Sequence, residues 1–364
     1  MLIVILAIIG LSLLILGHEA GHFFAAKLFG LKVDEFGFGF PPRMFAWRPR
    51  KTRGNRGEPV RQAQGETEYS LNWLPFGGFV RIAGENDGMV AKMESEGAVG
   101  EADKKRLFYF QAAWKKFLIV AAGVATNFVI GWFLLSVILM VGTPKILVVG
   151  EVQKNSPAEQ TGLLAGDIIK GFTDAKSFVD FTNLHRGQPT PFTVMRDGRD
   201  LSFTITPRVK TEPNEGAIGV LLAEGGEPRQ GFFASIWEGL KRALWICGLT
   251  ITALYNLVKN LAFRGSLLEG VVGPVGIFSV AQEAGRVGII YLVQLASLIS
   301  LNLAVVNLIP FPALDGGRLL LVAIEKIKKS PIPWKAEAWV NAFGFALLIA
   351  LMALLTVRDV GRFF

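Results

Sequence analysis

The chain has 364 residues, of which 51% are hydrophobic and only 19% are charged, and its mean hydropathy is +0.42. The charged share is below the quarter that is usual for soluble domains, which indicates a membrane protein. Many of the basic residues behind the net charge of +8 flank apolar runs or fill one loop, which favours contact with lipid headgroups over nucleic-acid binding. The single cysteine, Cys247, excludes an intrachain disulfide and cysteine-rich zinc sites, so any metal must be held by His, Asp or Glu.

The first apolar run extends from Met1 to Gly17, and we expect its helix to continue through Ala26 as a transmembrane segment within residues 1–30. It has no basic n-region and no small-residue cleavage site, so we expect it to be retained rather than removed as a signal peptide. The expected helix contains the sequence GHEAGH, which begins at Gly17 and ends at His22. Burying two histidines and a glutamate in hydrocarbon is costly, so these groups need a compensating partner.

His18 and His22 are four residues apart, so on a helix both imidazoles project from one face. Two imidazoles in this arrangement can bind one zinc ion, and Glu19 can act as general base for a zinc-activated water that attacks a peptide bond. The alternatives are a chance pattern, or polar residues that are satisfied within a helix bundle. The pattern uses two of the 3 histidines in the chain, and ionisable groups inside a membrane segment favour a functional role.

Three further apolar runs reach the length of about 20 residues that a helix needs to cross a bilayer. We expect the second, third and fourth transmembrane helices in these segments: 113–142 (Phe117 to Gly142), 287–330 (Val287 to Leu314) and 331–364 (Ala338 to Val357). A shorter run, Ala243 to Val258, lies within residues 224–286 and carries polar side chains. For this run, a helix lying at the membrane interface is as well supported as a fifth crossing.

Residues 31–112 form a polar loop whose first half is basic and whose second half contains a strand-like stretch, Tyr69 to Gly84. The charged, glycine-containing residues 85–105 are expected to be flexible. A second basic cluster, Lys326 to Lys329, follows the third span. Because basic residues concentrate in cytoplasmic loops, we expect both loops in the cytoplasm and residues 143–230 on the outside.

Residues 143–223 are typical of one small soluble α/β module. The run ILVVGEV predicts a strand, and it is followed by a short helix with Ser156 as N-cap, Pro157 at the first helical position and Gly162 as terminator. Two alternating runs on either side of Asp197-Gly198 predict a β-hairpin.

Catalytic zinc takes three protein ligands and leaves one position open, so one ligand is still to be found. His185 lies in the outside module, which makes it a poor candidate. The end of the third span, NLIPFPALDGGRLL, is better, because two prolines interrupt the helix and Asp315 stands where irregular backbone can line a cavity. Asn302 and Asn307 are further polar groups of this run, although hydrogen bonding between helices competes as an explanation for Asn302.

GHEAGH on the first span, with NLIPFPALDGGR on a later one, resembles the site-2 protease family of intramembrane zinc metalloproteases. The similarity is closest to the bacterial branch typified by the regulator of sigma-E protease. It covers nearly the whole chain, because further stretches match in order: FGFGFPPR (36–43), YSLNWLPFGGFVRIAGE (69–85), AAGVATNF (121–128), NSPAEQTGLLAGDII (155–169) and GPVGIF (273–278).

This resemblance implies that His18, His22 and Asp315 are the zinc ligands and that Glu19 is the general base. The implied fold is a mostly α-helical membrane protein with about four transmembrane helices, a membrane-associated β-hairpin region and one inserted α/β PDZ domain. The implied location is the bacterial inner membrane, with the PDZ domain outside the cytoplasm and the active site opening toward the cytoplasm.

The resemblance also assigns substrate contacts: Asn307 would hold the substrate strand near the metal, and Gly77 and Gly78 would belong to a hairpin that presents an extended substrate. The implied reaction is regulated intramembrane proteolysis, after a first cut outside, of transmembrane proteins such as anti-sigma factors or remnant signal peptides. Membrane lipids are expected partners, and nucleic acid is not. A membrane-anchored PDZ scaffold with a structural or inactive metal site is the main alternative, and a cation transporter is a weaker one.

Two departures from the family pattern stand out. Better-known members carry two PDZ modules in tandem, whereas this chain has room for one. The family's AGPxxN on the second span is AGVATN here, with Val124 in place of proline and Asn127 retained. We expect Val124 to change the local start of the helix rather than to abolish activity.

Overall fold

The computed structural model describes residues 2–49, 67–85, 104–196, 198–211, 215–264, 273–330 and 332–363. Most of the segment predicted to be flexible, part of the basic half of the first loop, and Asp197 of the predicted turn lie outside the described residues. The chain forms two compact units. The helical unit comprises Met1–Leu135, Gly239–Gln282 and Leu292–Phe364, and the α/β unit comprises Ser136–Glu238 and Glu283–Tyr291.

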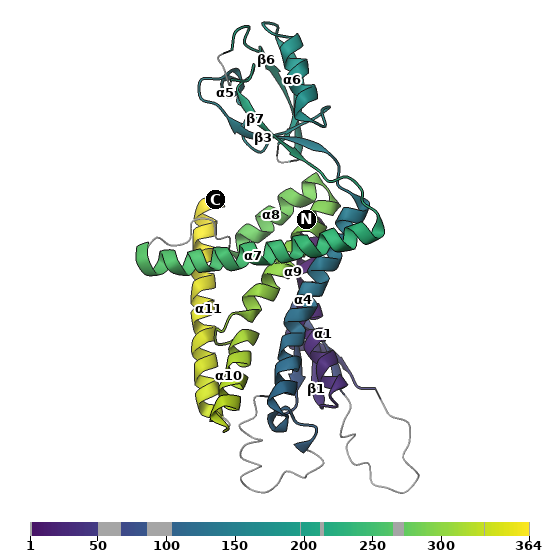
Figure 1. Ribbon diagram of the computed structural model, residues 1–364, viewed down its shortest axis with the longest axis vertical. Helices are drawn as coiled ribbons and strands as arrows, with labels where there is room; N and C mark the ends of the chain where they lie inside the picture. Colours follow the sequence, from purple (N-terminus) through teal and green to yellow (C-terminus); the bar gives the residue numbers. More distant parts are fainter. Residues whose placement is uncertain are drawn as a thin grey trace. The chain divides into compact units, whose positions relative to one another are not determined.

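Among the described residues, four helices are long and apolar enough to cross a membrane, as the sequence predicted. They are α1 (Leu2–Leu28), α4 (Ala113–Val141), α9 (Ile289–Leu308) and α11 (Trp334–Phe363), shown in Figure 1. Helix α4 begins at Ala113, the first residue of the predicted second segment, and continues through Val124 without a break, so Val124 does not lie at the start of the helix. Helix-forming neighbours on both sides carry the helix through a β-branched residue, whose intrinsic preference is weak compared with burial.

The predicted third span, Val287 to Leu314, is shorter than expected. Val287 belongs to α8 (Pro274–Val287), and α9 ends at Leu308, before Pro310. Prolines at 310 and 312 lack the N–H groups that an uninterrupted helix would use. Residues 309–314 instead form tight turns, with the Phe311 N–H donating to the Ile309 carbonyl at 2.7 Å. A separate helix, α10 (Asp315–Lys328), then begins, which agrees with the predicted break in the span.

The short apolar run that could have been a fifth crossing is the middle of a longer helix, α7 (Phe232–Arg264). It is not among the helices apolar enough to span a membrane, because charged and polar residues recur along it. In the helical unit, α7 runs across the direction of α9 and α11 (Figure 1), and Thr250 donates a 2.7 Å hydrogen bond to Asn302 of α9. Asn302 therefore forms a hydrogen bond between helices, which was the alternative to a role in the metal site.

Strands β1 (Val33–Trp47) and β2 (Glu68–Ile82) form an antiparallel two-stranded sheet. The residue pattern predicted the second strand, and the family resemblance implied a β-hairpin in this region. Its base is anchored in the core of the helical unit, because Val33 and Ile82 are buried in one cluster with residues of α1, α4 and α10. Farther along β2, a Cβ at Gly77 would lie 3.3 Å from Ile15 of α1. The hairpin therefore passes alongside α1, close to the GHEAGH segment.

The α/β unit contains a five-stranded sheet with strand order β6-β5-β4-β3-β7, in which all neighbours are antiparallel. Its elements are β3 (Ile146–Val152), α5 (Pro157–Gln160), β4 (Ile168–Ile169), α6 (Ala175–Leu184), β5 (Thr190–Arg196), β6 (Arg199–Ile205) and β7 (Val220–Gly225). The predicted cap is confirmed: Ser156 accepts the Glu159 N–H at 3.1 Å. Leu147, Val149, Phe178 and Val194 lie in the buried core of this unit.

Candidate metal centre

The two histidines of GHEAGH lie one turn apart on α1, and their rings meet edge to face with centroids 4.8 Å apart. Each residue is only 8% exposed, so both imidazoles are removed from bulk solvent. The glycines of the motif let α1 approach α4 closely, because a Cβ at Gly21 would lie within 3.0 Å of Ala122 and Thr126. Small residues at a contact between membrane helices allow this kind of close approach.

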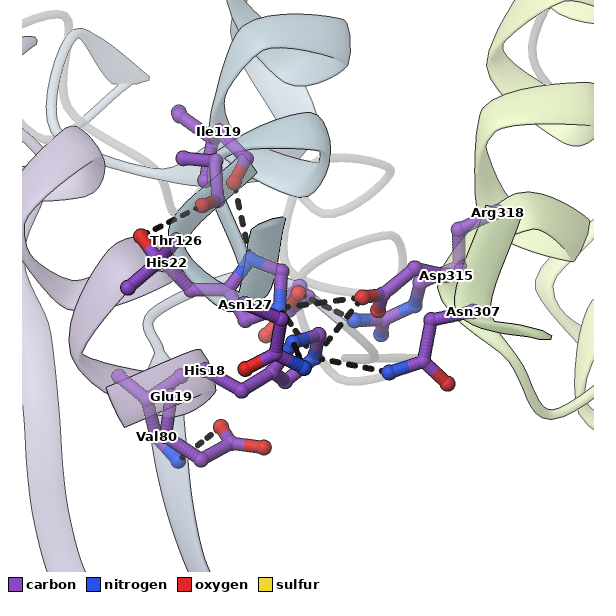
Figure 2. Close-up of polar contacts among 12 residues, drawn as sticks. His18, Glu19, His22, Val80, Ile119, Thr126, Asn127, Asn307, Asp315 and Arg318 are labelled. Atoms are coloured by element: carbon purple, nitrogen blue, oxygen red, sulfur yellow. Dashed lines mark hydrogen bonds and ion pairs between the residues drawn. The ribbon is translucent and has the colours of Figure 1, made fainter. Parts of the chain in front are cut away.

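Asp315, the first residue of α10, completes a triangle with the histidines. Its Oδ2 atom lies 3.0 Å from Nε2 of His18 and 3.3 Å from Nε2 of His22, and the two Nε2 atoms are 3.2 Å apart. Figure 2 shows the three side chains converging from α1 and α10. Tetrahedral zinc with bonds of about 2.0–2.2 Å would place its ligand atoms about 3.3–3.6 Å apart. The three observed distances are close to that spacing.

The position of Asp315 depends on the two glycines that follow it. A Cβ at Gly316 would collide with the carbonyls of Leu308 and Ile309, and a Cβ at Gly317 would collide with that of Phe311. The start of α10 can therefore fold back onto the end of α9 only because both residues lack a side chain. This close approach brings the Asp315 carboxylate to α1.

The chemistry of these three side chains fits a bound cation. Among the described residues, Oδ2 of Asp315 has no hydrogen-bond partner in suitable geometry, although two imidazole nitrogens lie within 3.3 Å. A buried carboxylate oxygen without a partner is costly. Two neutral imidazoles and a carboxylate are ligands that zinc accepts in catalytic sites. A divalent ion among these three atoms would satisfy all of them.

Helix α4 supports both histidines from the outer side. Nδ1 of His22 lies 2.9 Å from the carbonyl oxygen of Ile119, and Nδ1 of His18 lies 3.2 Å from the side-chain nitrogen of Asn127. Gly123 lies between these two contacts, and a Cβ there would come within 3.0 Å of both imidazoles. Asn127 stood out in the sequence as a retained motif residue, but the sequence indicated no role in the site for Gly123 or Ile119. The four-residue spacing of the three positions was the available signal.

Glu19 follows His18 directly on α1, and its carboxylate is held by the hairpin. Its Oε2 atom accepts the backbone N–H of Val80, on β2, at 3.0 Å (Figure 2). Strand β2 therefore fixes one oxygen of the predicted general base. Every residue except proline has a backbone N–H, so the residue type at position 80 gives no indication of this contact.

The remaining predicted site residues, Asn307, Gly77 and Gly78, lie in the helical unit, whereas the rejected candidate His185 lies in the α/β unit. Asn307, near the end of α9, places its side-chain nitrogen 3.5 Å from Nε2 of His18. Gly77 and Gly78 lie on β2 against Ile15 and Leu16 of α1, respectively. His185 is at the end of α6 in the α/β unit, where its ring bonds to the Phe181 carbonyl at 2.8 Å. It is not part of the cluster of three potential metal ligands.

Residues 6–55 and 57–351 match the sequence model of peptidase family M50. This chain belongs to peptidase family M50. Among M50 relatives, a Clostridium perfringens protein whose name classes it as a zinc metalloprotease is 32% identical over 362 residues, which cover 98% of each chain. The zinc metalloprotease RasP of Geobacillus kaustophilus is 29% identical and covers 96% of each chain. The regulator of sigma-W protease RasP of Bacillus subtilis is 28% identical and covers 99% of each chain.

Membership of M50, the site-2 protease family, makes this chain a zinc metalloprotease. Its four apolar helices and its bacterial relatives make it a bacterial membrane protein. The M50 relatives extend over nearly the whole chain, so the similarity includes both the α1 segment with GHEAGH and the later segment with LDGG.

A substitution at Gly123 tests whether the space beside the two imidazoles is needed for zinc binding. A control at another helical glycine tests whether any glycine-to-alanine change in these helices has the same effect. Gly123→Ala places a methyl group against the His18 and His22 rings and should displace them, so the purified variant should contain less than half of the zinc of the unchanged protein. Gly10→Ala on α1 is the matched control, because a Cβ at Gly10 meets nothing within 4 Å. Zinc per chain is measured by elemental mass spectrometry. Full zinc content in the Gly123 variant would contradict the predicted packing.

Proposed function

We propose that this M50 protein is an intramembrane zinc endopeptidase of the branch typified by the regulator of sigma-E protease. His18, His22 and Asp315 hold the zinc ion, and Glu19 is the general base. The observation that carries the proposal is the buried triangle of ligand atoms with sides of 3.0–3.3 Å, built from two helices that are far apart in the sequence. The adjacent Glu19 favours catalysis, because a purely structural metal site needs no base.

Each residue of the site has a separate role in the proposed hydrolysis. When bound, zinc supplies Lewis-acid chemistry, which lowers the pKa of a water molecule to about 7 and polarises a carbonyl group. Glu19 takes a proton from the attacking water and returns it to the leaving amine. The Val80 N–H holds one carboxylate oxygen of Glu19, and we expect the other oxygen to accept the proton. Asn307 lies close enough to His18 to orient a substrate strand at the site.

The substrate is an extended segment of a transmembrane protein. A transmembrane helix hides its carbonyl groups in its own hydrogen bonds, so hydrolysis requires local unwinding. An exposed strand edge can pair with the unwound segment and hold it. The β1–β2 hairpin, with Gly77 and Gly78 next to α1, is suited to this task. Regulated proteolysis of anti-sigma factors or remnant signal peptides after a first outside cut fits a relative named for regulating sigma-W.

The α/β unit acts as a PDZ domain outside the cytoplasm, and the metal centre opens toward the cytoplasm. A five-stranded antiparallel sheet with two short helices supports the PDZ assignment. The basic residues in the loop between the first two spans, and the lysines at the end of α10, support this orientation. A membrane-anchored PDZ scaffold with an inactive metal site is the second candidate. It is favoured only if a zinc-loaded preparation leaves every tested transmembrane helix intact.

The test uses the full chain in proteoliposomes with single-span peptides. We expect cleavage within the apolar segment of the peptide, located by mass spectrometry. Removal of the metal with 1,10-phenanthroline should reduce the rate at least 100-fold, and added zinc should restore it while added magnesium should not. Cleavage only outside the apolar segment, or activity that survives complete removal of zinc, would contradict the proposal.

A further inference from the structure

Three positions of α4 face the histidines at a spacing of four residues: Ile119, Gly123 and Asn127. Residues four apart share one face of a helix, so these positions form one continuous line on α4. The outer two contact Nδ1 atoms of the two imidazoles, and the glycine between them leaves room for both rings. This line is the surface of α4 against which both histidines are held.

The geometry restricts which nitrogen of each ring can carry the proton. Nε2 of His18 and Nε2 of His22 point toward each other and toward Asp315, so as metal ligands both must offer their lone pairs there. Each Nδ1 must then carry the hydrogen and needs an acceptor. For His22 the acceptor is the carbonyl oxygen of Ile119 at 2.9 Å. A ring fixed in this way keeps its ligating nitrogen aimed at the metal.

For His18 the group at Nδ1 is the side-chain amide of Asn127, at 3.2 Å. This residue is 0% exposed, and its backbone carbonyl accepts a 2.7 Å hydrogen bond from Ser300 of α9, which fixes this part of α4. The two ends of an amide are interchangeable in heavy-atom geometry, and the orientation follows from the hydrogen-bond network. Within the part of the chain that the structure describes, Oδ1 has no hydrogen-bond partner, so no bond to that oxygen opposes rotation of the amide.

We propose that Asn127 is a positioning residue for the metal ligand His18: its Oδ1 accepts the Nδ1–H of that ring and thereby fixes the ring orientation and the tautomer that leaves Nε2 free. This inference rests on the proposed zinc site and adds a residue that acts on the metal only through His18. In the competing explanation, Asn127 is a buried polar residue that merely joins α4 to its neighbours.

Two variants of Asn127 separate the two explanations. Asn127→Leu keeps a similar volume and removes the acceptor, whereas Asn127→Asp keeps an acceptor and forms the carboxylate–histidine pair that is common in zinc sites. We expect the Leu variant to bind zinc about 10- to 100-fold more weakly, in line with the loss of an outer-shell partner. We expect the Asp variant to retain the affinity of the unchanged protein within a few-fold. Affinity is measured by competition with a chromophoric chelator on the full chain in detergent.

A second readout reports on the ring rather than on folding. In protein loaded with cobalt, the visible absorption bands of the Leu variant should shift, while those of the Asp variant should stay close to the original spectrum. Asn302→Leu is the matched control, because it removes a partly buried hydrogen bond between helices away from the metal and should change neither affinity nor spectrum. Thermal unfolding of all three variants shows how much packing each change disturbs.

The outcomes distinguish this inference from the function on which it rests. If the unchanged protein binds no zinc, the proposed function itself fails. If the unchanged protein binds zinc and Asn127→Leu binds it equally well, only the role of Asn127 is overturned. Equal weakening in the Leu and Asp variants would also overturn it, because the Asp side chain still offers an acceptor to His18.

Discussion

Replacing Glu19 with Gln should remove proteolysis while leaving zinc in the protein. The amide has nearly the shape of the carboxylate and can still accept the Val80 N–H, but it cannot take a proton from water at neutral pH. Loss of a general base lowers the rate of such reactions by about 100- to 10,000-fold. We therefore expect cleavage of a single-span peptide to fall by at least 100-fold, at unchanged zinc content and unchanged substrate binding.

The control for Glu19 is Glu283→Gln, an exposed glutamate of α8 that should leave the rate unchanged. The measurement combines single-turnover cleavage in proteoliposomes with elemental analysis of zinc on the same sample. Cleavage by Glu19→Gln at more than one tenth of the original rate, with zinc bound, would rule out this residue as the base. Because the variant should still bind substrates, it can also be used to capture them from membranes for identification by mass spectrometry.

Replacing Asp315 with Ala should remove the metal itself. The two remaining histidines supply only two ligands to the zinc ion, whereas a catalytic site takes three protein ligands. The loss of affinity should exceed the 10- to 100-fold change that follows when an outer partner is removed. We expect less than one tenth of the zinc of the unchanged protein after dialysis, and no measurable proteolysis.

The matched control for Asp315 is Asp34→Ala, which breaks a partly exposed ion pair with Lys32 on the same unit and should leave zinc content and rate unchanged. Asp315→Asn adds a second comparison, since it keeps the volume but removes the charge. Full zinc content in Asp315→Ala would show that another residue supplies the third ligand. In that case, the triangle of short distances would reflect packing rather than coordination.

The sequence by itself determined the features that depend on short-range spacing. Charge-free runs of sufficient length predicted the four apolar helices, and the four-residue spacing of His18 and His22 predicted two imidazoles on one helical face. The pairing of GHEAGH with LDGG predicted that Asp315 would meet them, and the structure does bring the three residues together. Their roles as ligands, and that of Glu19 as base, remain predictions for the experiments above.

Only the tertiary structure decided the features that depend on contacts between distant segments. The pairing of β1 with β2, the carbonyl of Ile119 at His22, and the N–H of Val80 at Glu19 involve backbone groups, which every residue possesses and which no residue type reveals. The role of Gly123 likewise depends on what stands opposite it on α1. Periodicity and propensity report the local preferences of one segment. The arrangement of two segments is set by packing and hydrogen bonding between them, and this arrangement surrounds the metal centre.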